Sequence, residues 1–119
     1  MNPIQETLED LRHVSGVKGC MVVTHDGLVV ADSLGPRYRQ DIVAGLSSYL
    51  AMTTNRALAE GGLGKFDSFV LHAAHGKSVF HDIGEAVLVV LMDQFADLEQ
   101  GRHELQSAAQ RLRRSARLG

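Results

Sequence analysis

The 119-residue sequence has one cysteine, Cys20, two prolines and no tryptophan, and only 5% of its residues are aromatic. A single cysteine cannot form an intramolecular disulfide, which fits a reducing compartment. Because aromatic residues are few and are not interleaved with a basic face, nucleic-acid binding is disfavoured. No charged leader followed by an apolar run opens the sequence, so we expect no signal peptide.

Long apolar runs are also missing. The longest, Ala86–Met92, is far shorter than the roughly 20 residues that a membrane-spanning helix needs. The formal net charge of −2 gives no overall attraction to nucleic acid or to an anionic membrane. We therefore expect a soluble, cytoplasmic protein.

Hydrophobic residues make up 45% of the chain, and a chain of this length buries roughly two thirds of its unfolded surface. Residues 1–119 therefore fit a single domain with its own core. The end of the chain is basic, because after Gly101 the only acid is Glu104, against five arginines: Arg102, Arg111, Arg113, Arg114 and Arg117. Such an end either holds an acidic partner or forms the solvated face of a last helix.

Hydrophobic periodicity and glycine-marked turns predict three helices and five strands. Asp26-Gly27, between two β-rich runs, is a strong hairpin signal. The expected helices are 4–14, 37–60 and 95–118, and the expected strands are 19–24, 28–33, 67–74, 78–83 and 86–92. This α-β-β-α-β-β-β-α order predicts an α/β sandwich, of the α+β kind, around a five-stranded, mostly antiparallel sheet.

The strand 86–92 is apolar at every position, and 20–23 nearly so. A half-exposed strand would alternate, so both strands are expected in the middle of the sheet with both faces covered. We place the helix 37–60 alone on one face and the other two helices on the opposite face.

This placement makes the strands 28–33 and 67–74 the edges of the sheet. The run 68–74 contains no proline, lysine or formal charge, and an open edge of this kind invites pairing. The same strand of a second copy could pair with it across a two-fold axis. The alternative is that a loop or helix end of the same chain covers it.

The helix 37–60 has two distinct sides. A cluster of residues lies toward one side: Tyr38, Ile42, Leu46, Tyr49, Leu50 and Ala57. Small residues follow another side: Ala44 or Gly45, Ser48, Ala51, Asn55 and Ala59. Small side chains let two helices approach closely, so we expect Ser48, Ala51 and Asn55 at a contact between two copies of this helix.

We find no convincing catalytic or metal site. Gly61-Gly62-Leu63-Gly64-Lys65 follows a helix and has Phe66 where a phosphate-binding loop needs a hydroxyl, so it is a turn. His72 and His81 share a predicted hairpin, where an even turn would place them directly or diagonally opposed on one face and an odd turn on opposite faces. Zinc, however, needs three or four ligands. Cys20 is expected in the core. We therefore predict no metal, no cofactor and no enzymatic activity.

The run Val14-Ser15-Gly16-Val17-Lys18-Gly19, the hairpin 21–33 and the run 86–91 carry a family resemblance. Together they make the chain similar to the roadblock family, named for dynein light chains and including regulators of small Ras-like GTPases. The resemblance implies the sandwich described above and a homodimer built through the strand 68–73 and the long helix. It also implies that the dimer binds a small GTPase and alters nucleotide hydrolysis or exchange by repositioning the GTPase's own catalytic groups.

Carried onto this sequence, the resemblance gives the dimer strand as Ser68, Phe69, Val70, Leu71, His72 and Ala73. It gives the partner-facing positions of the helix as Arg39, Gln40, Ser47, Thr54 and Arg56. The leading hypothesis is a signalling regulator of a small GTPase. Two alternatives remain: a scaffold or cell-polarity adaptor with no effect on nucleotide turnover, and a sensor of a small ligand.

Overall fold

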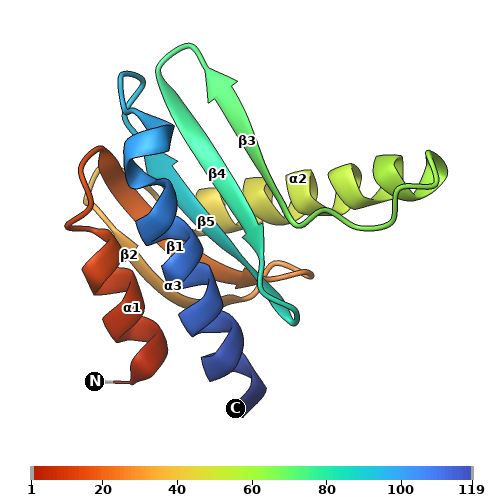
Figure 1. Cartoon of the computed structure of the whole chain (residues 1–119), viewed down its shortest axis with the longest axis horizontal. Coiled ribbons are helices and arrows are strands. Elements are labelled where there is room, and N and C mark those ends of the chain that lie inside the picture. Colours follow the sequence, from red (N-terminus) through yellow and green to blue (C-terminus); the bar gives the residue numbers. More distant parts are fainter. Residues whose placement is uncertain (1, 119) are drawn as a thin grey trace.

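The computed structural model describes the backbone of residues 2–118 and the side chains as far as Ser115. Its three helices and five strands follow the predicted order (Figure 1). The elements are α1 (Pro3–Leu11), β1 (Val17–Thr24), β2 (Val29–Leu34), α2 (Gln40–Glu60), β3 (Ser68–Ala73), β4 (Gly76–Asp82), β5 (Ala86–Met92) and α3 (Leu98–Leu118). The predicted fold class, an α+β sandwich, is confirmed.

Several boundaries differ from the prediction by one to three residues. α1 ends at Leu11 rather than at residue 14, and β1 begins at Val17 rather than at residue 19. α2 begins at Gln40 rather than at residue 37, after an extended Arg39. α3 begins at Leu98 rather than at residue 95, where an Asp97 carboxylate oxygen accepts a hydrogen bond from the Glu99 N–H at 3.0 Å. β4 begins at Gly76, since a two-residue turn leaves Gly76 paired with Ala73.

The strands form one antiparallel sheet in the order β2-β1-β5-β4-β3. β1 and β5 are therefore inner strands, and β2 and β3 are the edges, as the apolar pattern predicted. Residues 19–23 of β1 are buried, as is every residue of β5 except Leu91. The two apolar runs hold the sheet together because both of their faces lie inside the protein.

Each face of the sheet has its own core. Cys20 and Val22 of β1 point into a cluster with residues of α1 and α3. Met21 and Val23 point the other way, into a cluster with Ala44 and other residues of α2. Figure 1 shows α1 and α3 in front of the sheet and α2 behind it. The predicted distribution of helices over the two faces is confirmed.

The orientation of α2 about its own axis is not the expected one. Ala44, Ser47 and Ala51, at intervals of three and four residues, are buried on the side that faces the sheet. They share one helix face, and their small size lets the helix lie close to a sheet face already filled by Phe80 and Met21. The small-residue side is therefore the inner side of α2, where Val43, Leu50 and Leu58 also pack against the core. Ile42, Leu46 and Tyr49 lie outside.

A tight turn at Gly16 joins α1 to β1. Gly16 has a positive φ of 88°, and a Cβ built there would lie 2.7 Å from the Ala96 Cβ. Its carbonyl oxygen accepts a hydrogen bond from the Asp93 N–H at 2.8 Å. This contact joins the start of β1 to the end of β5, so the position requires glycine both for its backbone conformation and for space.

Replacing Gly16 with alanine should lower the free energy of unfolding by about 1–3 kcal/mol, because the side chain meets Ala96 in a strained conformation. Urea unfolding at a fixed protein concentration measures this. Gly45→Ala is the matched control, since a Cβ on Gly45 meets no atom within 4 Å and the helix should gain up to about 1 kcal/mol. Equal stability of Gly16→Ala and the wild type would contradict the argument.

Candidate functional site: an open strand beside an exposed helix face

The edge strand β3 is open along its outer side. It pairs with β4 in an unbroken register, from Ser68 opposite His81 to Ala73 opposite Gly76. Within the part of the chain that the structure describes, β3 pairs with no other strand, and no side chain hydrogen-bonds to its backbone. Its outer N–H and C=O groups are therefore free to pair with another strand.

The other edge, β2, is protected by α1. Gln5 Nε2 donates a hydrogen bond to the Asp32 carbonyl at 2.9 Å, and Arg12 Nη1 donates one to the Ser33 carbonyl at 2.8 Å. A register shift between Val22 and Val23 also interrupts the pairing of β1 with β2. The backbone groups on the outer side of β3 are therefore available to pair with another strand, whereas those of β2 are partly occupied by α1.

Aromatic contacts fix β3 on the α2 side of the sheet. The rings of Phe69 and Phe80 stack with their centroids 4.4 Å apart and 6° between their planes. Phe66 meets Phe69 edge to face at 4.8 Å, in a geometry favourable for aromatic pairs. β3 is therefore held firmly as an edge strand, with Val70 and Leu71 both partly exposed on it.

The outer face of α2 is apolar. Ile42, Leu46 and Tyr49 are 49%, 60% and 61% exposed. Their spacing of four and three residues places them on one side of the helix, away from the buried small residues. We call these three residues the outer stripe of α2. Contiguous exposed apolar surface is common where proteins bind partners, so the outer stripe is a candidate binding surface.

α2 also extends past the sheet to which it is attached. Its last fully buried residue is Ala51, and the helix continues to Glu60, with Leu58 partly buried against the same core. Figure 1 shows this second half projecting beyond β3, at the end of the sheet where β3 begins. The open edge of β3 and the projecting half of α2 thus lie on the same side of the molecule.

The predicted dimer residues of β3 lie on an open edge, whereas those of α2 contact their own chain. Ala51 is 1% exposed and belongs to the chain's own core, so it is not on an outer helix face. Ser48 donates a hydrogen bond to the His25 carbonyl at 3.0 Å. Asn55 Oδ1 accepts one from the Phe66 N–H at 2.9 Å. Both half-buried side chains therefore stabilise the fold of their own chain.

The predicted partner-facing positions are also divided. Ser47 is only 5% exposed, because it lies on the sheet-facing side of α2, so its prediction as an exposed position is wrong. Thr54 is half-buried, whereas Arg39, Gln40 and Arg56 are exposed. Arg39 precedes the helix and pairs with its neighbour Asp41 at 3.1 Å. The outer stripe is visible in the sequence only as an apolar side of the helix and is not among the predicted sites.

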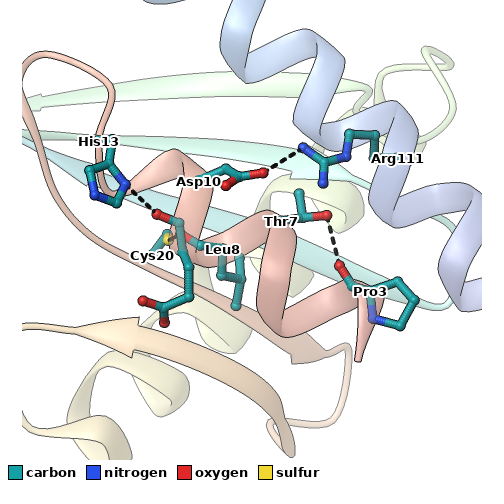
Figure 2. A network of polar contacts seen from close by, with 8 residues as sticks. Pro3, Thr7, Leu8, Asp10, His13, Cys20 and Arg111 are labelled. Atoms are coloured by element: carbon teal, nitrogen blue, oxygen red, sulfur yellow. Dashed lines mark hydrogen bonds and ion pairs between the residues drawn. The ribbon is translucent and has the colours of Figure 1, made fainter. Parts of the chain in front are cut away.

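Cys20 has the properties of a core residue, as predicted. It is fully buried, and its thiol donates a hydrogen bond to the Leu8 carbonyl at 3.3 Å. Burial raises its pKa to about 12, so the reactive thiolate does not form at neutral pH. Figure 2 shows Cys20 under α1. On the same helix, Asp10 pairs with Arg111 at 3.1 Å and the Thr7 hydroxyl donates to the Pro3 carbonyl at 2.8 Å.

His72 and His81 share one face of the β3–β4 hairpin, but they are not opposed. The even turn sets His72 opposite Lys77 and His81 opposite Ser68, so the two rings lie four residues apart along the strands. The expected direct or diagonal opposition is therefore wrong. Across the described side chains, no three His, Cys, Asp or Glu residues gather as a metal ion would require.

The basic end of the chain is largely engaged within the fold. Arg102 pairs with Glu99 at 3.2 Å and Arg111 pairs with Asp10. Arg113 donates a hydrogen bond to the Asp82 carbonyl. Arg114 is exposed, and Arg117 lies outside the described side chains. These contacts favour the interpretation of the arginines as a solvated helix face. None of the described helices has the length and apolar content needed to cross a membrane.

The fold is a domain of the sandwich class, and an open strand and an apolar helix face are the most distinctive surface features of its described residues. The sequence profile of the Roadblock/LC7 domain matches residues 3–92. The chain therefore belongs to the Roadblock/LC7 family, and α3 follows the matched region.

Relatives and solved structures agree with this assignment. The uncharacterized protein MJ1340 of Methanocaldococcus jannaschii is 34% identical over 110 residues, which cover 92% of this chain and 96% of the relative. MglB of Myxococcus xanthus superposes with a TM-score of 0.87 at 18% identity, over 93% of this chain and 92% of that one. The gliding protein MglB of Thermus thermophilus gives 0.86 at 22% identity, over 98% and 90%. At these identities, the structural matches establish the fold.

His81 should make stability depend on pH. Burial, and secondarily the positive charge of Arg113, lowers the pKa of His81 below its usual 6.5. The unfolded chain therefore takes up the proton first, so stability is complete above about pH 6.5 and declines as the pH falls below it.

Urea unfolding of the wild type and of His81→Gln at pH 7.5 and pH 5 measures this contribution. His81→Gln should lose less stability than the wild type over this interval. His103→Gln, at an exposed position on α3, is the control and should lose as much as the wild type. If His81→Gln lost as much unfolding free energy as the wild type between pH 7.5 and pH 5, His81 would not contribute to the pH dependence of stability.

Proposed function

We propose that this protein is a non-catalytic homodimer that binds a small Ras-like GTPase and modulates its nucleotide cycle. Two observations carry the proposal: the open edge of β3 and the exposed outer stripe of α2. Family membership supports the choice of partner, since the roadblock resemblance implies a dimeric regulator of such GTPases. Its place of action would be the cytoplasm, where it would take part in signalling.

The dimer is argued from the edge strand. Two antiparallel copies of β3 related by a two-fold axis would join the sheets of both subunits and satisfy the free backbone groups of both edges. The same operation would place the projecting half of each α2 under the sheet of the other subunit. That half would then gain apolar contacts beyond those it makes within its own chain.

The second surface is the outer stripe of α2. Ile42, Leu46 and Tyr49 point away from the sheet, so pairing of β3 would leave them available on the face of the dimer. Aromatic and large aliphatic side chains are typical anchors of protein interfaces. Bound there, a GTPase would have its switch loops held in one arrangement, which shifts their population and thereby alters hydrolysis or exchange.

The dimer is tested with a charge on the open strand. Leu71→Glu should give a monomer or an aggregate, because like charges would face each other near the two-fold axis while the backbone pairing is lost. Light scattering at micromolar concentration reads the mass. Val30→Glu, on the protected edge β2 and also exposed, should leave a dimer. A wild-type chain that runs as a monomer would refute this part of the proposal.

The partner is tested with the outer stripe. Leu46→Ala and Tyr49→Ala should each weaken binding to a co-encoded small GTPase about 10- to 100-fold, the effect of losing an interface anchor. Titration of the GTPase loaded with GDP or with a non-hydrolysable GTP analogue measures this. Leu28→Ala, an exposed apolar residue on the β1–β2 turn, is the control.

Hydrolysis and exchange assays on the same proteins distinguish a regulator of the nucleotide cycle from a scaffold that does not alter it. The proposal expects a changed rate of hydrolysis or exchange in the complex. Binding without any change in rate would leave a scaffold or polarity adaptor. A GTPase panel that forms no nucleotide-dependent complex at all would remove the GTPase from the proposal.

A further inference from the structure

An open cavity of about 300 Å³ lies at the end of the sheet where β3 finishes. Its apolar floor includes Leu71 of β3 and Leu91 of β5, and Tyr38 lines its wall. Leu91 is the one residue of β5 that is not fully buried. The cavity exists because α2 packs over β1 and β2 and leaves this end of the α2 face uncovered.

The rim of the cavity is basic. Lys18, Arg37, His75 and Lys77 line it, against one acid, Asp93, and the Lys77 ammonium donates a hydrogen bond to the Ala96 carbonyl. An oxygen of that carboxylate accepts a hydrogen bond from the Phe95 N–H at 3.1 Å. Within the described residues, neither Lys18 nor Arg37 forms a salt bridge. On a chain whose net charge is −2, this rim is a local positive site beside an apolar floor.

The far end of α2 has the opposite character. Its last turn contains Glu60 and no basic residue, so the partial negative charge of the helix C-terminus is not offset there. Among the described residues, Glu60 has no salt-bridge partner. Leu63, two residues past the helix cap, is 73% exposed. An electronegative helix end and an apolar side chain thus project together from the molecule.

Two-fold symmetry brings these features together. α2 passes behind the sheet at the level where β3 begins (Figure 1), whereas the cavity lies at the level where β3 ends. A two-fold axis perpendicular to the sheet at the middle of β3 would place the end of β3 in one subunit at the level where β3 begins in the other. It would also keep the α2 helices of both subunits on the same face of the joined sheet. The partner's α2 would therefore arrive on the α2 face of the sheet at the level of the cavity.

The length of the projecting helix is sufficient. Residues 52–60, beyond the last buried position of α2, span about 13 Å at 1.5 Å per residue. From β3 across β4 to β5 is two strand spacings, or about 10 Å. The helix end can therefore reach the floor formed by Leu71 and Leu91, and the rim that includes Lys18 and Arg37.

We propose that in the dimer each cavity receives the last turn of the partner's α2, with the partner's Glu60 beside Arg37 and Lys18 and the partner's Leu63 over the apolar floor. The occupant is a second copy of this chain, and the inference rests on the proposed homodimer. Pairing of opposite charges at this contact would set the alignment of the two helices and disfavour other strand registers.

Charge reversal across the interface tests the contact. Arg37→Glu and Glu60→Arg should each raise the dissociation constant of the dimer about 10-fold or more, measured by analytical ultracentrifugation. The double variant should return to within about threefold of the wild type, because the pair is restored with exchanged signs. Arg114→Glu, on the exposed side of α3, is the control and should dimerise normally.

Cysteine cross-linking tests the same geometry without relying on charge. Proteins carrying Glu60→Cys and Arg37→Cys, mixed and oxidised with oxidised glutathione, should give a covalent dimer. The pair Glu60→Cys and Glu85→Cys should not, because Glu85 lies in the β4–β5 turn, away from the cavity. The native Cys20 does not compete, being fully buried.

The outcomes separate this inference from the dimer on which it rests. A stable wild-type dimer in which neither reversal weakens association, or in which the double variant is no better than the singles, would overturn the cavity contact and leave the dimer standing. A wild-type monomer would remove both. Cross-linking through Glu85 rather than Arg37 would overturn the cavity contact and show a different arrangement of the two helices.

Discussion

The burial of β1 and β5 on both faces is the constraint on which the rest of this structure depends. Two apolar strands in the middle of a sheet need a layer on each side, and the chain has three helices for the purpose. α1 and α3 together cover one face, and α1 also protects the edge at β2. α2 alone covers part of the other face, so β3 and the neighbouring end of the sheet remain open.

How α2 meets the sheet explains its outer surface. Met21, Phe80 and Phe69 are large side chains of the sheet that lie between the two layers. A helix can lie close to such a face only with small side chains, which are here Ala44, Ser47 and Ala51. The larger apolar residues of the outer stripe are then necessarily turned to solvent. The stripe is therefore a direct result of how the volume of this core is divided.

Most of the fold could be predicted from the sequence, since it rests on strong local signals. The continuous apolar runs identify the inner strands, the Asp26-Gly27 turn identifies the first hairpin, and the uncharged run from Ser68 identifies the open edge. The rotation of α2 could not be predicted from its own residues, because both its sides are apolar and differ mainly in size. The large inward-facing residues of the sheet, Phe80 above all, are the signal that could have decided it. The burial of Ser47 follows from the same rotation.

α2 has two levels of local stability, because its first half contains the fully buried residues and its second half is held only by partly buried side chains such as Asn55 and Leu58. Residues up to Ala51 are held by the core, so their amide hydrogens exchange with solvent only in large openings, whereas the second half can fray at lower cost. Any contact that holds the second half in place, whether from another subunit or from a ligand on the outer stripe, reduces the ordering cost that the next contact must meet. Assembly and ligand binding would thus be thermodynamically linked through one helix, each favouring the other by the same free energy.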